Sequence, residues 1–419
     1  MHYDLNYVKE NREALVKSMQ KRGIDYPVDK IIDVYEKVKE LRRQVDEDRH
    51  RRNEISEDFR KQTDEDRKLV KTLKKGIEEK EKEIESLIKE AYSLFQRMPN
   101  ILDDTVPIGK DDSENISIKK HGEIRKLDFI PKGHEELAEN KDLIDMERAA
   151  KITGSRFYYL KGKLVILDMA LQRYVMDKLM PKGYTPIVPP FMMNRNAYEG
   201  VTSLQDFEEV LYKVSGKEDT GDTEKYMIAT SEHPLAAMYM NEDIPEEKLP
   251  LKYIGISQCF RREAGSHGKD TKGIFRVHQF NKVEQFMFCK PEDSASMHEE
   301  LLKNAEEIYQ ELGLPYRVVN ICTGDIGIIA TKKYDIEGYM YSQDKYKELV
   351  SCSNCTDWQS RRLNIKYVDR SGDKKFLHTL NSTAISQRPL VAILEAYQQK
   401  DGSIKVPEVL VKYTGFDTI

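Results

Sequence analysis

Apolar residues recur at alternating steps of three and four in two stretches near the start of the chain. The first seam contains Ile31, Val34, Val38, Leu41, Val45, Asp48, Arg52, Ile55 and Phe59. The second seam contains Val70, Leu73, Ile77, Lys80, Ile84, Leu87, Ala91 and Leu94. This spacing is the coiled-coil period, so the sequence predicts two long helices, each with one apolar stripe.

The ends of the second helix are marked by local signals. Thr63 is followed by three acidic residues, which is typical of a helix start with a capping hydroxyl and acids in the first turn. Pro99 cannot continue a helix, so the second helix is expected to end before it. The break at residues 61–63 is therefore expected to be the tip of a helical hairpin.

One antiparallel register joins the two seams. It pairs Leu41 with Leu87, and it places Asp48 opposite Lys80. The charge within one seam then meets an opposite charge in the other. We therefore expect an antiparallel coiled-coil arm at about residues 28–98.

A pattern with period two occurs at residues 259–288. An apolar run ends at Phe260, a segment rich in Gly, Ser and Lys follows, and apolar residues alternate with polar ones from Phe275 to Val283. This pattern predicts two antiparallel strands joined by a long loop.

Four charged residues are expected on one face of this strand pair. Arg261 and Glu263 are two residues apart, so they should point to the same side of the first strand. Arg276 and Glu284 belong to the predicted return strand. Two guanidinium groups and two carboxylates suit a ligand with anionic and cationic parts, such as a nucleotide with an amino acid. Charge alone would favour the alternative, a hairpin on a solvated surface.

The chain from about residue 112 onward shows mixed strand and helix patterns. Residues 162–180 predict a helix followed by a strand with several prolines, and residues 378–397 predict a strand that runs into a helix. Thr230 and Glu232 alternate in the segment MIATSEHPL, so both are expected to face one site. With 419 residues, the chain has room for two or three domains.

Charge limits the ways in which the chain could bind nucleic acid. The net charge is −5, so affinity for phosphate must come from local basic patches. The arm carries one such cluster, in which arginines of the first helix lie near the height of lysines of the second. Its members are Arg49, Arg51, Arg52, Lys71, Lys74 and Lys75. The alternative is a solvated coiled coil that serves dimerisation or spacing.

The five cysteines are odd in number and lie in apolar surroundings, which indicates reduced thiols and a cytoplasmic location. Cys352 and Cys355 form a C-x-x-C pair, but no second pair stands at zinc spacing, so no zinc is expected. No apolar run approaches the roughly 18–20 residues that a membrane helix needs, so no membrane partner is expected.

Three segments resemble sequence motifs of a known enzyme class. The segment FRREAGSHGKDTKGIFRVHQFNKVEQF resembles motif 2 of the class II aminoacyl-tRNA synthetases, in the form typical of the seryl-tRNA synthetase family. GYTPIVPPFMM resembles motif 1, with Pro190 as its signature proline, and HTLNSTAISQRPLVAILEAYQ resembles motif 3. With the arm included, the resemblance covers nearly the whole chain.

The resemblance implies an α+β fold with two domains. The class II catalytic domain, built on an antiparallel sheet, would span residues 111–419, and an N-terminal tRNA-binding domain with the coiled-coil arm would span residues 1–110. Motif 1 would lie at about 162–192, motif 2 at about 258–288 and motif 3 at about 376–399. A homodimer with motif 1 at its interface is also implied.

The resemblance also implies the ligand contacts. The catalytic arginines would be Arg261, Arg276 and Arg388. Serine would be bound by Thr230, Ser231, Glu232, Arg261, Glu284, Asn381 and Thr383. ATP would contact Arg261, Arg262, Glu263, Arg276, Val277, Phe280, Glu348, Leu349, Val350, Ser351 and Arg388. Glu348 and Ser351 offer hard oxygen atoms and would hold Mg²⁺ together with ATP.

Individual roles follow from the same resemblance. Arg261 would hold the α-phosphate and the serine carboxylate, and Glu284 would read the serine hydroxyl. Phe280 would stack on adenine against Arg388. Motif 3 departs from the family pattern, because Arg388 stands seven rather than eight positions after Asn381. This shorter turn would shift Arg388 relative to ATP unless the loop absorbs the change.

The implied function is ATP-dependent ligation of L-serine to serine tRNA through a seryl-adenylate. The basic cluster of the arm would grip the long variable arm of serine tRNA, and selenocysteine tRNA is a second candidate acceptor. The chain ends about thirty residues after Arg388, so no C-terminal anticodon-binding domain is expected. The alternatives are a ligase that loads a carrier protein, a non-catalytic synthetase paralogue, and a coiled-coil structural protein.

Overall fold

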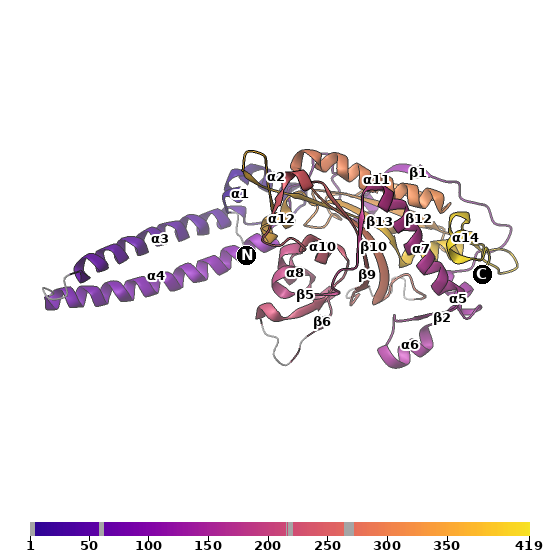
Figure 1. The fold of residues 1–419 in the computed structure, drawn as a ribbon, viewed down its shortest axis with the longest axis horizontal. Helices are drawn as coiled ribbons and strands as arrows, with labels where there is room; N and C mark the ends of the chain where they lie inside the picture. Colours follow the sequence, from indigo (N-terminus) through magenta and orange to yellow (C-terminus); the bar gives the residue numbers. More distant parts are fainter. Residues whose placement is uncertain (1–4, 58–62, 215, 217–220, 264–271) are drawn as a thin grey trace. The chain divides into compact units, whose positions relative to one another are not determined.

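The computed structural model describes residues 5–57, 63–214, 216, 221–263 and 272–419 (Figure 1). The chain divides into two compact units, Tyr3–Ile101 and Leu102–Ile419, apart from its first two residues. The sequence places the boundary slightly later, at residue 110. Within the described part of the chain, no helix combines the length and the apolar character needed to cross a membrane.

The described part of the N-terminal unit is helical. Its helices are α1 (Leu5–Glu10), α2 (Arg12–Lys21), α3 (Val28–Ser56) and α4 (Asp64–Arg97). Helices α3 and α4 form the antiparallel arm, and α1 and α2 pack on α3 (Figure 1). A small apolar core ties these helices together at the base of the arm. It contains Val8, Leu15, Met19, Val28, Ile31, Phe95 and Met98.

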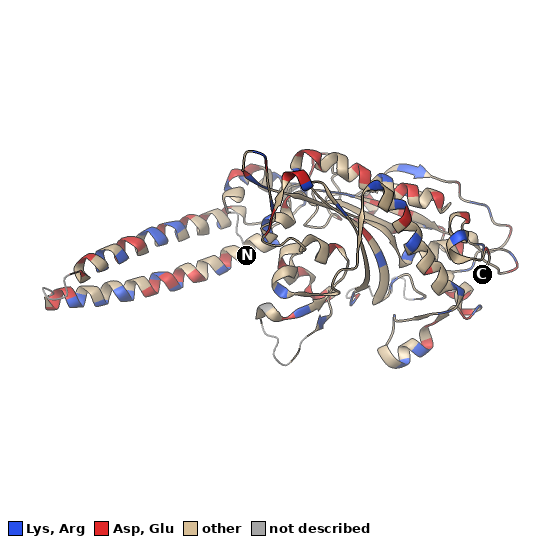
Figure 2. Cartoon of the chain, viewed as in Figure 1, with Lys and Arg blue, Asp and Glu red and all other residues tan. Residues whose placement is uncertain are grey.

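The arm has the predicted seam and register. The buried residues of α3 are Val28, Ile31, Val34, Val38, Leu41 and Val45. Lys80 Nζ donates to Asp48 Oδ2 at 2.7 Å, so the two seam charges meet as the register requires. Charged residues of both signs alternate over the rest of the two helices (Figure 2). The predicted coiled-coil hairpin is therefore confirmed.

The helix ends also agree with the sequence. The Thr63 hydroxyl accepts from the Asp66 N–H, and the Asp66 carboxylate accepts from the Thr63 N–H at 2.9 Å, which is a reciprocal capping box. Helix α4 ends at Arg97, two residues before Pro99. Phe59 and residues 61 and 62 of the expected tip lie outside the described residues.

The C-terminal unit contains a large sheet. Eight of its described strands form the order β1-β11-β12-β13-β16-β10-β9-β4. All neighbours are antiparallel except β4 and β9, which are parallel. This arrangement confirms the expected antiparallel α+β body. The strands are β1 (Ile116–His121), β4 (Thr185–Ile187), β9 (Leu251–Phe260), β10 (Gln279–Cys289), β11 (Tyr316–Asn320), β12 (Lys332–Met340), β13 (Lys345–Asn354) and β16 (His378–Ser386).

Smaller elements surround this sheet. The helices are α5 (His134–Glu139), α6 (Met146–Thr153), α7 (Lys163–Leu179), α8 (Arg195–Val201), α9 (Leu204–Phe207), α10 (Glu232–Ala236), α11 (Ser294–Glu311), α12 (Trp358–Leu363), α13 (Gln387–Tyr397) and α14 (Glu408–Thr414). The short strands are β2 (Ile144–Asp145), β3 (Tyr159–Leu160), β5 (Met192–Asn194), β6 (Lys213–Val214), β7 (Lys225–Met227), β8 (Asp243–Pro245), β14 (Lys366–Val368) and β15 (Lys374–Phe376).

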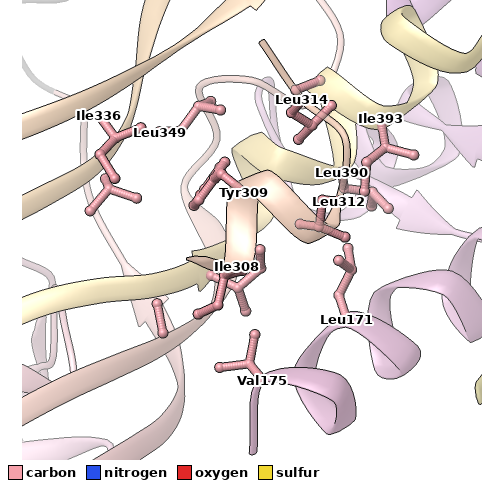
Figure 3. Close-up of a cluster of buried hydrophobic side chains, with 14 of the residues drawn as sticks. Leu171, Val175, Ile308, Tyr309, Leu312, Leu314, Ile336, Leu349, Leu390 and Ile393 are labelled. Atoms are coloured by element: carbon pink, nitrogen blue, oxygen red, sulfur yellow. The ribbon is translucent and has the colours of Figure 1, made fainter. Parts of the chain in front are cut away.

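Each face of the large sheet is covered by its own apolar cluster. On one face, helices α7, α11 and α13 contribute side chains such as Leu171, Ile308 and Leu390 to one apolar cluster, which also contains Ile336 of the sheet (Figure 3). On the other face, Phe286 of β10 packs in a second cluster with residues of α8, α10 and α12. Glu284 precedes Phe286 by two residues, so it points to the second face.

Two β-bulges change which side chains share that second face. In β13, Ile336 pairs with Val350 and Glu337 pairs with Glu348, so Leu349 is the extra residue. In β16, Ala384 is the extra residue in the pairing with β10. A bulge reverses the alternation of side chains beyond it. Glu348 and Ser351, three residues apart, therefore reach the same side of the sheet.

Three of the four charged residues predicted on one pleated surface lie outside the strands. Strand β9 ends at Phe260, so Arg261 and Glu263 follow it, and Glu263 has a φ of +49°. Strand β10 begins at Gln279, so Arg276 precedes it. The strand assignment of these residues was wrong because the alternating pattern continues past both strand ends. Residues 264–271 of the predicted loop lie outside the described residues.

Motif 1 and the MIATSEHPL segment also differ from the prediction. The prolines divide the expected motif 1 strand into β4 and β5, because Pro lacks the N–H that a sheet requires. Thr230 and Glu232 lie in the turn after β7 and at the start of α10, so strand alternation does not set their directions. The expected helix at residues 162–180 is confirmed as α7, and the motif 3 strand and helix are confirmed as β16 and α13.

Candidate active site

Arg261 is held just beyond the open end of the strand pair β9–β10, where β9 ends and β10 begins. Its N–H donates to the His278 carbonyl at 2.9 Å, and His278 Nδ1 donates to the Arg261 carbonyl at 2.8 Å. Its guanidinium donates to the Ala229 carbonyl at 3.2 Å and lies 5.2 Å from the centre of the Phe280 ring. One backbone and one side-chain hydrogen bond to His278 thus hold Arg261 in place just beyond the two strands.

The return segment of motif 2 supplies further groups beside Arg261. Arg276 forms an ion pair with Glu263, with an Nη1–Oε2 distance of 3.0 Å. The guanidinium of Arg388 lies 5.0 Å from the centre of the Phe275 ring. The shorter motif 3 turn therefore does not remove Arg388 from this part of the molecule.

These groups line a first cavity. It is lined by Arg261, Glu263, Phe275, Arg276, Val277, Phe280, Lys282, Glu348, Leu349, Ser351, Thr383, Ser386, Gln387 and Arg388. Most residues expected to contact ATP are therefore brought together. Arg262 and Val350 are not among them, because Arg262 is exposed and Val350 is buried in the core. Phe275 was missed because it was taken as part of the strand pattern only.

The bulge in β13 places a carboxylate and a hydroxyl at this cavity. Glu348 and Ser351 both line it, and Arg388 donates to the Glu348 carbonyl at 2.9 Å while its Nη1 lies 3.2 Å from Glu348 Oε2. The Glu348 side chain is 46% exposed, so desolvation costs its charge little, and the positive charges of Arg388 and Lys333 lower the pKa of Glu348. Glu348 is therefore ionised at neutral pH.

A second cavity of about 490 Å³ adjoins the first. It is lined by residues that include Thr230, Glu232, Glu284, Asn381, Cys355, His233 and Lys333. Four residues line both cavities: Arg261, Lys282, Glu348 and Ser351. Of the expected serine contacts, Thr383 lines the first cavity, and Ser231 lines neither because its hydroxyl donates to the Gly255 carbonyl at 3.1 Å.

Lys282 is the main residue that the sequence did not reveal. Its Nζ lies 2.6 Å from Glu284 Oε2 and donates to Thr230 Oγ1 at 3.0 Å. It therefore links two residues that the family resemblance assigns to serine. A lysine in an alternating strand is a common surface pattern, so only its spacing of two from Glu284 could have indicated a place in the site.

Buried carboxylates dominate the electrostatics of the second cavity. Burial and repulsion from Glu284 raise the pKa of Glu232 to about 7, against the attraction of Lys282. Burial also raises the pKa of Glu284, while Lys282 opposes that shift. Burial lowers the pKa of His233 to about 3, so its ring is neutral. Asp206 and Glu348 also line this cavity, as do the cations Arg261, Lys282 and Lys333. The cavity thus offers charges of both signs, which complements a ligand that carries both.

Only some side chains of the basic cluster of the arm form ion pairs with acidic residues. Arg49 lies 2.6 Å from Glu81, and Lys75 lies 3.7 Å from Glu79. Arg51, Lys71 and Lys74 are exposed and form no ion pair with another residue that the structure describes. These three side chains can therefore be presented to an anionic partner.

Comparison with known proteins supports this description of both units. Residues 3–102 match the family model described as seryl-tRNA synthetase N-terminal domain. Residues 212–397 match the model described as tRNA synthetase class II core domain (G, H, P, S and T). The serine–tRNA ligase of Methanocella arvoryzae is 51% identical over 98% of both chains.

Solved structures of relatives extend the likeness to the fold. The seryl-tRNA synthetase from Pyrococcus horikoshii complexed with ATP has a TM-score of 0.90 and 46% identity, covering 100% of this chain and 99% of that chain. The cytoplasmic serine-tRNA ligase from Naegleria fowleri in complex with AMP has a TM-score of 0.86 and 38% identity, with the same coverage.

The antiparallel sheet, with its two cavities at the ends of β9 and β10, is the catalytic core of a class II aminoacyl-tRNA synthetase. The N-terminal unit and the full-length relatives narrow this class. The chain belongs to the seryl-tRNA synthetase family, the serine–tRNA ligases.

Proposed function

We propose that the two cavities hold ATP and serine next to each other and that seryl-adenylate forms where they meet. The observation that carries this proposal is the set of four residues common to both cavities: Arg261, Lys282, Glu348 and Ser351. The relative from Pyrococcus horikoshii was solved with ATP, which supports the nucleotide assignment. Serine, ATP and serine tRNA are then the substrates.

The reaction would proceed in two displacements. A carboxylate oxygen of serine attacks the α-phosphorus of ATP, and the bond to pyrophosphate breaks. A ribose hydroxyl at the end of the tRNA then attacks the acyl carbon, and AMP leaves. Neither step needs a nucleophilic side chain, so the protein contributes positioning and neutralisation of charge on phosphate. Arg261, fixed at the junction of the cavities, would hold the α-phosphate and the serine carboxylate together.

In the first cavity, Arg276 and Arg388 would contact phosphate groups, because both guanidinium groups line it. Glu263 would accept from the adenine amino group, and Phe280 would stack on the base against Arg388. In the structure, Phe280 faces Arg261 and Arg388 faces Phe275. Adenine stacked between Phe280 and Arg388 would therefore lie beside two aromatic–cation contacts, one made by each of these residues.

In the second cavity, Glu232 and Glu284 would bind the serine ammonium group and hydroxyl, with Thr230 and Asn381 as further polar contacts. Thr383 would reach serine from the first cavity. A site built to hydrogen-bond a hydroxyl rejects an analogue without it by roughly 10⁴–10⁵. Alanine should therefore be refused without an editing step. Threonine would have to be excluded by size.

The donor set at Glu348 and Ser351 fits Mg²⁺. A carboxylate that stays ionised and a hydroxyl on the same side of the sheet are hard oxygen ligands. No group of three or more His, Cys, Asp or Glu side chains suitable for a metal occurs among the described residues, so phosphate oxygens would complete the coordination. When bound, Mg²⁺ would neutralise charge on the pyrophosphate leaving group.

The N-terminal unit would bind tRNA through the basic cluster of the arm. The exposed side chains of Arg51, Lys71 and Lys74 support this role, because contacts to phosphate need cations that are not already paired. Serine tRNA would be the main acceptor and selenocysteine tRNA a second one.

A cytoplasmic location is supported by the five free thiols.

A homodimer through motif 1 is supported by apolar side chains exposed around it. Met169 of α7 is 64% exposed and Val188, just after β4, is 68% exposed, and Ile166 of α7 is also exposed. Exposed apolar groups that gather in one region commonly mark an interface between subunits.

Serine-dependent exchange between ATP and pyrophosphate tests the adenylation site. We expect Arg261→Ala to lower kcat/KM by roughly 10²- to 10³-fold, as for loss of a group that neutralises charge in a transition state. Arg262→Ala is the matched control, because Arg262 is exposed and absent from both cavities. Equal losses of activity in the two variants would contradict the proposed adenylation site.

Aminoacylation assays of the wild type with serine tRNA and with selenocysteine tRNA then test the two proposed acceptors.

A further inference from the structure

The return segment of motif 2, residues 272–278, reaches the first cavity before β10 begins. Phe275, Arg276 and Val277 of this segment line the cavity. Their positions therefore depend on what holds the backbone of this segment, because the regular ladder of the strand pair β9–β10 starts only at Gln279.

A histidine outside the three motifs contacts this segment. The N–H of Ile274 donates to His134 Nε2 at 3.0 Å, and the ring of His134 is buried, with 3% exposure. A backbone N–H can only donate, so Nε2 must carry a lone pair. A neutral ring in this contact has its proton on Nδ1.

Two carboxylates face the other ring nitrogen. His134 Nδ1 lies 3.4 Å from Glu395 Oε1 and 3.3 Å from Glu135 Oε2. Neither carboxylate has hydrogen-bond geometry to Nδ1, but both negative charges favour a proton on Nδ1. A proton there leaves Nε2 free to accept from Ile274. The tautomer that the contact requires is therefore the one that its surroundings favour.

Glu395 is itself held firmly. It is 1% exposed, and its carboxylate accepts from the N–H and the hydroxyl of Ser342, both at 2.9 Å, and from the His134 N–H at 3.3 Å. Burial opposes its charge, but the His134 and Ser342 contacts outweigh burial and lower the pKa of Glu395. Glu395 lies on α13, which also carries Arg388.

The segment is shaped to approach the ring closely. Gly273 has a φ of +66°, and a Cβ added at this position would lie 2.1 Å from His134 Nε2. Any other residue would therefore be strained by its backbone and would also collide with the imidazole. The absence of a side chain at Gly273 therefore allows the backbone to come close enough for the hydrogen bond to His134.

We propose that His134, oriented by Glu395, is a positioning residue for ATP, because it anchors the backbone that presents Phe275 and Arg276 to the first cavity. This inference rests on the proposed assignment of that cavity to ATP. The anchor joins the motif 2 return segment to the motif 3 helix. Glu395 thus connects the two segments that carry arginines toward ATP. It belongs to α13, which carries Arg388, and it orients His134, which holds the segment that carries Arg276.

The test combines kinetics with hydrogen exchange on the full-length protein. We expect His134→Ala to raise the KM for ATP in pyrophosphate exchange up to about tenfold, the effect of one net hydrogen bond, with a change below about twofold in the KM for serine. Amide exchange in peptide 272–277 of the ATP-free protein should be faster by a similar factor. His134→Gln, which keeps an acceptor near the Nε2 position, should restore part of both effects.

Two further variants separate this role from a general loss of stability. His298→Ala removes another buried imidazole, which contacts the Cys352 carbonyl at 3.1 Å, and should leave exchange in peptide 272–277 unchanged. Glu395→Gln keeps the packing and should shift the same two readouts by a smaller factor, even where His134→Ala fails to fold. Unchanged exchange in peptide 272–277, or equal rises in the KM for ATP and for serine, would overturn the inference.

Arg276→Ala tests the cavity assignment by itself. A wild-type KM for ATP in Arg276→Ala would contradict the proposed ATP site, and with it this positioning role. A raised KM in Arg276→Ala beside a wild-type KM in His134→Ala and Glu395→Gln would contradict the anchor alone.

Discussion

The carboxylate of Glu284 is buried beside Lys282 and lines the cavity assigned to serine. Truncating one member of a buried charge pair costs about 2–5 kcal/mol, and part of that cost is the charge left unpaired. We therefore predict that Glu284→Ala lowers kcat/KM for serine by roughly 10²- to 10³-fold in pyrophosphate exchange. Glu284→Gln, which keeps the shape and a hydrogen-bonding group, should lose less.

The fold should survive both changes, which thermal unfolding would check. Near-normal exchange activity in Glu284→Ala would refute the assignment. A uniform fall in affinity for both ATP and serine would point to a structural effect instead, because Glu284 does not line the first cavity.

We predict that serine binding depends on pH, because the pKa of Glu232 is raised. Its pKa, raised to about 7 by burial and by Glu284, leaves part of the population protonated at neutral pH in the empty site. The serine ammonium group requires the ionised form, so affinity is complete above this pKa and falls as the pH drops below it. We expect the KM for serine to rise by up to about tenfold per pH unit below 7.

Measurement of both KM values between pH 6 and pH 8 checks this prediction. The KM for ATP should change little over the same range, because Glu348 stays ionised throughout. Glu232→Gln should remove the pH dependence of the KM for serine. A dependence that persists in Glu232→Gln would assign it to another group.

Sequence reasoning found the residues whose motif spacing is distinctive and missed those whose surroundings decide their role. Arg261, Glu284 and Arg388 reach the cavities as expected. Lys282 and His134 were missed, because a lysine in a strand and a histidine near a helix start have many uses. Only the fold shows that they contact Thr230 and Ile274, respectively.

At the scale of elements, the arm gives the clearest prediction. Replacing roughly Val38–Leu87 with a short linker removes the coiled coil above the small core at its base. Adenylate formation should be spared, because the cavities are lined by the C-terminal unit alone, and charging of tRNA should be lost. Pyrophosphate exchange and charging assays on the same preparation would check both halves.

A milder change tests the basic cluster itself. Lys71→Ala with Lys74→Ala should raise the KM for tRNA and lower its salt dependence by about one unit of slope for each phosphate that the arm no longer neutralises. Lys37→Ala is the matched control, because Lys37 on the same arm lies 2.7 Å from Glu83. An identical effect in the control would mean that the arm acts by overall charge.

Helices were easier to predict than strands. The arm was placed almost to the residue, because its seam extends over many turns and the start of α4 has an explicit cap. The strand pair was found, but its ends were not, since alternation in Arg261, Glu263 and Arg276 continues where the ladder has stopped. The bulges at Leu349 and Ala384 have no signal in the sequence, because they arise from pairing between distant strands.

At the scale of the whole molecule, the exposed apolar residues of motif 1 predict a dimer. Met169→Glu would place a charge in the proposed interface, so we expect the protein to shift from dimer to monomer in sedimentation or light scattering. Ile24→Glu, at an exposed isoleucine of the other unit, should leave the mass unchanged. A monomeric wild type would rule out the proposed assembly.

The general architecture was within reach of the sequence. Its two parts differ in hydrophobic period, and the period alone separates a helical unit from a mixed body. The division of the chain falls at Ile101, whereas the sequence suggested residue 110, because contacts rather than composition define where a compact unit ends. The placement of two cavities side by side could be inferred only from family likeness.

The extra residue at Leu349 has a consequence for how this protein can change over time. Glu348 and Ser351 share a side only because one more amino acid stands between them than regular alternation would allow. Loss of a single codon there would turn one of these two side chains to the other side of the sheet while every other residue type stayed the same. Within these strands, selection must therefore preserve residue count as strictly as residue identity.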